Sequence, residues 1–211
     1  TEQILTDTLK YYYPEATYIT EESEKIIGNE EMIVIDPIDG TTNFIHGIPL
    51  VGIVIAKIIN EEITDGVIYN PILDDFFWAS KGKGSWCNNN RLRVSKRQDI
   101  IDCIIGTGIP HMDRIYPQYL KEIDAITKNC AGLRRMGAAS IDLAYVAAGK
   151  LDAYWERNLN IWDVSAGVLL VKEAGGRVSQ PNGESWDIHS KDILVSNSNI
   201  HEIIQEKLEI I

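Results

Sequence analysis

The chain has 211 residues, 45% of them hydrophobic, and a formal net charge of −11 at pH 7. This length and apolar content suffice to bury a substantial single core. The negative charge argues against non-specific nucleic-acid binding, which needs clustered Lys and Arg. No apolar run approaches the ~20 residues that span a bilayer, and no basic and apolar leader is present, so we expect a cytoplasmic protein without membrane contact.

The first predicted elements are a helix over residues 4–12, which stops before a proline, and a strand over 16–19. That strand runs into Glu21-Glu22. The apolar residues 33–35 predict a buried strand that ends at Asp36, after which Pro37 and Gly40 predict a tight turn. Both strand ends therefore carry acidic side chains.

Antiparallel hairpins are predicted next, from strands at 51–59, 66–70 and 76–79 with turns at Asp65-Gly66 and Asp74-Asp75. The basic segment that follows contains Leu92-Arg93-Val94-Ser95, which alternates like a strand with one solvated face. The tyrosines at 11–13 and the tryptophans at 78 and 86 are interpreted as core or interface residues, with core favoured. Cys87, Cys103 and Cys130 match no zinc spacing and are expected to be reduced thiols.

Helices dominate the predicted second half. They are expected over 116–128, from Ser140 to Ala148 after Gly137, over 164–171 and from about residue 199, with strands at 153–156, 177–179 and 193–196. No repeat or low-complexity linker divides the chain.

The segment Asp36-Pro37-Ile38-Asp39-Gly40-Thr41-Thr42 carries the strongest functional signal. Two carboxylates and the Ile38 carbonyl are ligands that suit a hard cation such as Mg²⁺. The N–H groups and hydroxyls from Gly40 onward suit a phosphate. Taken alone, the string is also good turn chemistry. Likewise, Glu21-Glu22 alone could be a solvated loop, and Asp163 could be only the N-cap of the following helix.

Together these motifs resemble the inositol monophosphatase superfamily of lithium-sensitive, Mg²⁺-dependent phosphatases. The resemblance rests on Glu21-Glu22-Ser23, on Asp36 to Phe44, and on Trp162-Asp163 followed by Glu173 to Gly176. It extends through residues 81–85, 88–95 and 135–140. It implies a single α+β domain over residues 1–211, with the layered α-β-α-β-α sandwich of the inositol monophosphatase and fructose-1,6-bisphosphatase type, and a homodimer.

By motif, the resemblance implies metal ligands for about two to three Mg²⁺ ions: Glu21, Asp36, Ile38 through its carbonyl, Asp39 and Asp163. We assign Glu21, Asp36 and the Ile38 carbonyl to an ion that binds the nucleophilic water, and Asp36, Asp39 and Asp163 to one that stabilises the leaving oxygen. Glu22 is assigned an outer, water-mediated position. Thr41 is predicted to position the attacking water.

In relatives that threonine pairs with an aspartate upstream of the Glu-Glu motif, where this chain has not yet begun. Either the chain is part of a longer protein, which the helix beginning mid-pattern favours, or it lacks this pair. The interval between Glu22 and Asp36 is also shorter than in some relatives.

Substrate contacts are predicted from Ile38, Gly40, Thr41 and Asp163, and from Gly137-Ala138-Ala139, whose free N–H groups begin a helix. The small residues at 137–139 could instead serve packing. Glu156 matches a position that accepts polyol hydroxyls in relatives, but could be a plain surface residue. Arg157 is expected to pair with Glu156 or to face a partner.

Two classes of function follow. The favoured one is hydrolysis of a small phosphate monoester, with myo-inositol 1-phosphate as the nominal substrate. NADP 2′-phosphatase and fructose-1,6-bisphosphatase activities are alternatives for the same site. The other class is a binding role, because one bacterial branch of the family acts in transcription antitermination or RNA processing.

Overall fold

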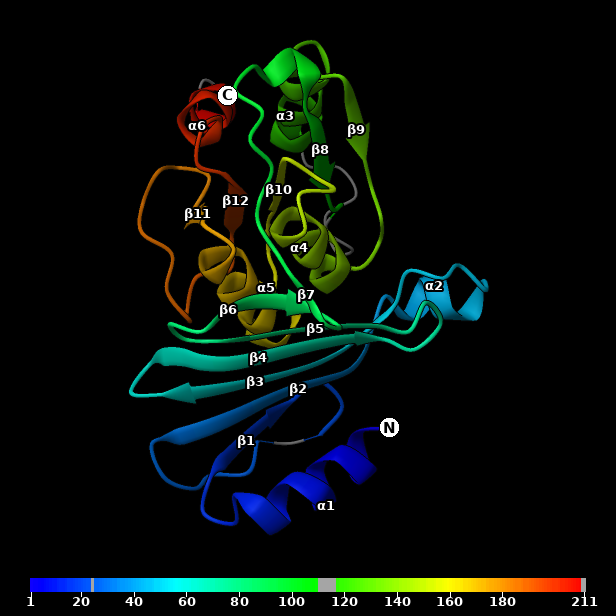
Figure 1. Cartoon of the computed structure of the whole chain (residues 1–211), viewed down its shortest axis with the longest axis vertical. Coiled ribbons are helices and arrows are strands. Elements are labelled where there is room, and N and C mark those ends of the chain that lie inside the picture. The colour runs from blue at the N-terminus through cyan, green and yellow to red at the C-terminus, as the bar shows by residue number, and fades with distance from the viewer. Residues whose placement is uncertain (24, 110–116, 210–211) are drawn as a thin grey trace.

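The computed structural model describes residues 1–23, 25–109 and 117–209, and its elements stack in five layers (Figure 1). The first sheet has the strand order β1 (Thr17–Thr20), β2 (Glu31–Asp39), β3 (Gly52–Ile59), β4 (Glu62–Asn70), β5 (Asp75–Ser80), β6 (Gly84–Cys87) and β7 (Asn90–Arg91). The second has the order β11 (Gly176–Ser179), β12 (Ile193–Asn197), β10 (Ala153–Glu156), β8 (Ile104–Thr107) and β9 (Gly132–Arg134).

Helices form the other three layers. One outer face of the first sheet is covered by α1 (Glu2–Tyr12), the space between the sheets holds α4 (Ala139–Ala147) and α5 (Ile161–Glu173), and the far face of the second sheet carries α3 (Pro117–Thr127) and α6 (His201–Glu209). A short helix, α2 (Thr41–Ile45), and a 3₁₀ turn, Ile100–Asp102, complete the described elements. The predicted α-β-α-β-α sandwich is confirmed.

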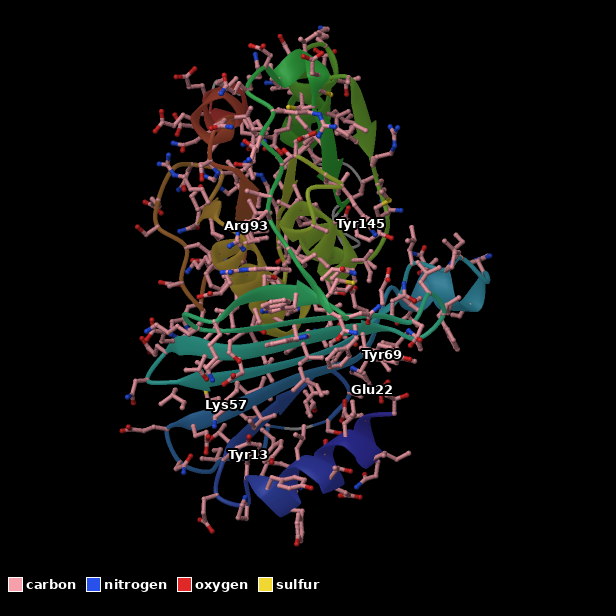
Figure 2. All side chains as sticks on the ribbon, viewed as in Figure 1. Tyr13, Glu22, Lys57, Tyr69, Arg93 and Tyr145 are labelled. Carbon is pink, nitrogen blue, oxygen red and sulfur yellow. The ribbon has the colours of Figure 1, made fainter. Side chains whose placement is uncertain are left out.

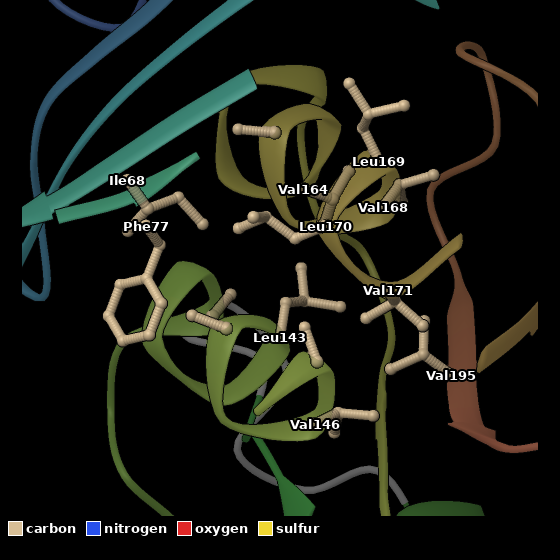
Figure 3. Packing of buried hydrophobic residues seen from close by; sticks show 14 of the residues in the cluster. Ile68, Phe77, Leu143, Val146, Val164, Val168, Leu169, Leu170, Val171 and Val195 are labelled. Atoms are coloured by element: carbon tan, nitrogen blue, oxygen red, sulfur yellow. The ribbon is translucent and has the colours of Figure 1, made fainter. Parts of the chain in front are cut away.

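The central helices are apolar around most of their circumference because a sheet lies on each side of them. Figure 3 shows Leu143 of α4 packed among Val164 and Leu170 of α5, with Phe77 of the first sheet and Val195 of the second at the two sides. This packing holds the N-termini of α4 and α5 at fixed places beside the end of β2.

The predicted turn at Asp65-Gly66 is wrong. The hairpin reverses at Asn60 and Glu61, whose φ values of 50° and 62° are those of a two-residue type I′ turn. Gly66 lies inside β4, where a Cβ atom would come within 2.9 Å of the Ala166 backbone in α5. This glycine allows a helix to approach the sheet, which a pattern of turn residues cannot distinguish from a reversal.

The predicted tight turn after Asp36 is also wrong, because β2 continues to Asp39. Asp36 pairs with Val54 and Asp39 with Gly52, so the strand carries one extra residue between these pairs. Such a bulge is expected where Pro37 has no N–H to donate to the ladder. The bulge turns the residues that follow out of the sheet.

Other expectations need correction. Tyr11 and Tyr12 are 82% and 68% exposed, so the core interpretation fails for them, whereas Tyr13 packs on the α1 side of the sheet with the Lys57 ammonium 4.5 Å from its ring (Figure 2). Trp78 and Trp86 stack with ring centroids 5.8 Å apart and are partly buried. Residues 92–95 connect the two sheets and form no strand.

The predicted helix over 116–128 is observed as α3 over Pro117–Thr127, and Tyr116 lies outside the described residues. The three cysteines are unpaired, as expected. Within the described part of the chain, no helix is long and apolar enough to cross a membrane.

Candidate active site

A cavity of about 810 Å³ opens where the end of β2 meets the N-termini of α4 and α5 and the end of β10. Its lining includes every predicted site residue except Glu22: Glu21, Asp36, Ile38, Asp39, Gly40, Thr41, Gly137, Ala138, Ala139, Glu156 and Asp163. Segments separated by more than 100 residues in the chain therefore face one space.

The parallel pairing of β1 with β2 explains how the two N-terminal motifs meet. Thr20 lies opposite Ile35 in the register, so the residues that follow them, Glu21 and Asp36, lie at the same end of the two neighbouring strands. Glu22 lies beyond this end: it is exposed, and its N–H donates to the Glu2 carboxylate of α1 at 3.1 Å (Figure 2). Glu21 therefore lines the cavity, whereas Glu22 does not and is tied to α1 through its backbone.

The bulged segment is organised by local hydrogen bonds. Asp36 is 1% exposed, and its Oδ1 accepts the Ile38 N–H at 2.9 Å. The Thr41 hydroxyl donates to the Ile38 carbonyl at 3.0 Å. Gly40, with φ 81°, occupies the left-handed conformation that begins α2. The Ile38 carbonyl and the Thr41 hydroxyl are thereby held beside the carboxylates.

Asp163 is not an N-cap. Asn160 is the N-cap of α5, and Asp163 sits in the first turn with its Oδ2 accepting the Asn160 N–H at 2.7 Å. One of the two carboxylate oxygens of Asp163 is therefore occupied by the capping box at the start of the helix. The side chain still lines the cavity.

The acidic side chains perturb one another. Burial, followed by repulsion from Asp39, Glu21 and Asp163, raises the pKa of Asp36 far above its ordinary value. Burial raises the pKa of Asp39 to about 6, although hydrogen bonds from Ser140 counteract the shift. Burial, with repulsion from Asp39 and Glu21, raises the pKa of Asp163 to about 7. Carboxylates arranged in this way require a positive charge to remain ionised together.

A divalent cation fits this donor set. Carboxylate oxygens and a backbone carbonyl are hard ligands, and Mg²⁺ needs only one or two carboxylates because it keeps several waters. Among residues 1–23, 25–109 and 117–209, no group of three or more acidic, histidine or cysteine side chains is arranged so that it could hold a metal ion without other ligands. The Ile38 carbonyl and water would therefore have to complete any coordination shell.

The opposite wall of the cavity contains Glu156, which is not a plain surface residue. Burial raises its pKa to about 7, and its Oε2 accepts a hydrogen bond from the Tyr154 hydroxyl. Arg157 neither pairs with Glu156 nor is left free for a partner: it binds the fully buried Glu122 at 2.6 Å and Asp192 at 2.8 Å. This ion-pair network fixes the connection between β10 and α5.

Sequence reasoning missed several contributors. Ser140 donates to Asp39, and the Asn43 amide donates to the Met136 and Leu50 carbonyls at 2.8 Å. Asp142, 1% exposed, lines the cavity with an Oδ1 that has no hydrogen-bond partner among the residues that the structure describes. The N-cap Asn160 was also missed, although Asn-x-x-Asp before an apolar run is a readable capping pattern.

Comparison with known proteins agrees with this geometry. A model of the inositol monophosphatase family matches residues 1–211. The chain belongs to the inositol monophosphatase family. It is 43% identical to the inositol-1-monophosphatase of Caulobacter vibrioides, over 98% of this chain and 83% of that protein. It is 41% identical to the Nus factor SuhB of Pseudomonas aeruginosa, over 93% of this chain and 75% of that protein.

Among solved structures, the inositol monophosphatase from Anabaena superposes with a TM-score of 0.96 at 35% identity. The match covers 100% of this chain and 84% of that one. Members of the inositol monophosphatase family generally use divalent metal ions, which accords with the acidic lining of the cavity.

Proposed function

We propose that the protein is a Mg²⁺-dependent phosphatase that hydrolyses a small phosphate monoester, with myo-inositol 1-phosphate as the leading substrate. The observation that carries the proposal is that Glu21, Asp36, Asp39 and Asp163 line one cavity, which Ile38 also lines. Membership of the family supports it. These five residues are proposed to hold about two to three Mg²⁺ ions.

Bound Mg²⁺ would supply a positive field for the phosphate and the departing oxygen and would lower the pKa of water. Side-chain and backbone groups of the protein would position the attacking water and the substrate. The Thr41 hydroxyl donates a hydrogen bond to the Ile38 carbonyl, so its oxygen lone pairs are free to accept a hydrogen bond from a water and to orient that water for attack. Thr41→Ala should therefore lower kcat more than it raises KM.

The remaining groups hold the substrate. The N-terminus of α4, at Gly137-Ala138-Ala139, offers N–H groups and a favourable dipole to a phosphate or hydroxyl oxygen. The N–H groups of Ala139 and Ser140 are already used by Asp39, so Gly137 and Ala138 offer theirs. Glu156 accepts a hydroxyl of the polyol on the opposite wall, which suits inositol better than an ester without hydroxyls.

The test is phosphate release from inositol 1-phosphate, NADP and fructose 1,6-bisphosphate, with EDTA and lithium as controls. Asp36→Asn and Asp163→Asn should each lower kcat/KM by about two or more orders of magnitude, since a ligand to the cation is lost. Asp99→Asn, at an exposed position away from the cavity, is the matched control. Metal-independent turnover, or full activity in both site variants, would refute the proposal.

A binding role in transcription antitermination is the second candidate, favoured by the 41% identity to a protein named Nus factor SuhB. A pull-down of transcription factors with the Asp36→Asn, Asp163→Asn double variant separates the two. Binding that survives loss of catalysis would support this role. We also propose a homodimer in the cytoplasm, which light scattering of the purified protein and cell fractionation would test.

A further inference from the structure

Ser140 makes an unusual pair of contacts at the start of α4. It is fully buried, and both of its donors reach the same oxygen: the backbone N–H donates to Asp39 Oδ2 at 2.7 Å, and the hydroxyl donates to it at 2.5 Å. Hydrogen bonds to an ionised acceptor are roughly twice as strong as neutral ones. One oxygen of Asp39 is thus fixed by two short bonds.

The surrounding backbone leaves room for this hydroxyl. Gly52 pairs with Asp39 across β2 and β3, and a Cβ atom on Gly52 would overlap the Ser140 hydroxyl. The Asn43 amide also ties α2 to the Met136 carbonyl, immediately before α4. The helix start therefore cannot shift away from Asp39 without breaking contacts made by the segment that follows Asp39.

We infer that Ser140 is a positioning residue for Asp39, whose carboxylate it orients so that the second oxygen faces the cavity and a divalent cation. The inference rests on the proposed function, because it gives Asp39 the role of a metal ligand. A carboxylate that must bind an ion gains affinity when its rotation is already restricted by an outer partner. Ser140 itself touches neither ion nor substrate.

The experiment compares Mg²⁺ binding to the wild type and to Ser140→Ala by titration calorimetry, without substrate. Loss of an outer hydrogen-bond partner of a metal ligand costs about 10- to 100-fold in affinity, and the retained Ser140 N–H places the expected loss near about tenfold. At saturating Mg²⁺, kcat should stay within about twofold, because Asp39 is still present. A purely structural role would lower stability without moving the Mg²⁺ dependence.

Two further variants complete the design. Ser165→Ala removes another fully buried helical hydroxyl, one without a hydrogen-bond partner in the described part of the chain, and should leave Mg²⁺ affinity unchanged. Gly52→Ala keeps Ser140 but displaces its hydroxyl, and should weaken Mg²⁺ binding as Ser140→Ala does. Equal affinity in the wild type, Ser140→Ala and Gly52→Ala would overturn the inference while leaving the phosphatase proposal intact. A wild type that binds no Mg²⁺ would overturn both.

Discussion

Gly108 is expected to control substrate preference through Glu156. A Cβ atom at this position would overlap both carboxylate oxygens of Glu156. The backbone cannot retreat, because the Tyr119 hydroxyl donates to the Gly108 carbonyl and the preceding strand β8 pairs with β10. In Gly108→Ala the flexible end of Glu156 must therefore move and release the Tyr154 hydroxyl.

The magnitude follows from the contact that is lost. A hydrogen bond to a charged acceptor contributes about 1.5–3 kcal/mol, and about 1.4 kcal/mol is a tenfold change, so kcat/KM for inositol 1-phosphate should fall roughly 10- to 100-fold. Stability should fall by about 1–3 kcal/mol, since the fully buried Tyr154 hydroxyl loses its acceptor. The loss should appear mainly in KM.

The assay compares inositol 1-phosphate with p-nitrophenyl phosphate, which has no hydroxyls for Glu156 to accept. Gly108→Ala should lower kcat/KM for inositol 1-phosphate and leave kcat/KM for p-nitrophenyl phosphate unchanged. Gly132→Ala is the matched control, because its Cβ would meet only the end of the Arg134 side chain, outside the cavity. An equal loss on both substrates, or no loss on either, would refute the reasoning.

Three stability predictions follow, each measured by urea unfolding. Burial lowers the pKa of His201 from 6.5 to about 4, so as the pH falls the unfolded chain binds the proton before the folded chain does. The free energy of unfolding should therefore be highest above pH 6.5 and should fall by about 3 kcal/mol between pH 6.5 and pH 4. His201→Asn should flatten this part of the pH profile, and an unchanged profile would contradict the assignment. Glu122→Ala should cost about 3 kcal/mol because it leaves the Arg157 guanidinium without its buried partner; a loss below about 1 kcal/mol would mean that Asp192 compensates. Gly167→Ala should destabilise by about 1–3 kcal/mol, since its Cβ would lie 2.5 Å from that of Leu143, and a stabilised variant would show that helix propensity dominates over packing.

Local chemistry made much of the site predictable. Asp36, Asp39 and Asp163 stand beside prolines, glycines and helix starts whose backbone preferences are set within a few residues. The same is true of most helices and strands, whose apolar periodicity is a local property. The family resemblance then supplied the layered fold and the residues expected to meet.

Local sequence patterns gave wrong predictions where the role of a residue depends on parts of the structure that are distant in the chain. Glycine is common in turns, but Gly66 lies in a strand, where its lack of a side chain allows α5 to pack close to the sheet. Tyr11 and Tyr12 have core-forming side chains, but α1 turns them outward.

The sequence by itself determined the acidic motifs, the elements that carry them and the family, because each depends on residues close together in the chain. Only the tertiary structure decided that the backbone of Glu22 is held by Glu2 of α1, and that Ser140 binds a carboxylate 101 residues away. The physical reason is that these contacts depend on strand register and on helix packing between two sheets. Both are set by the burial of many side chains at once.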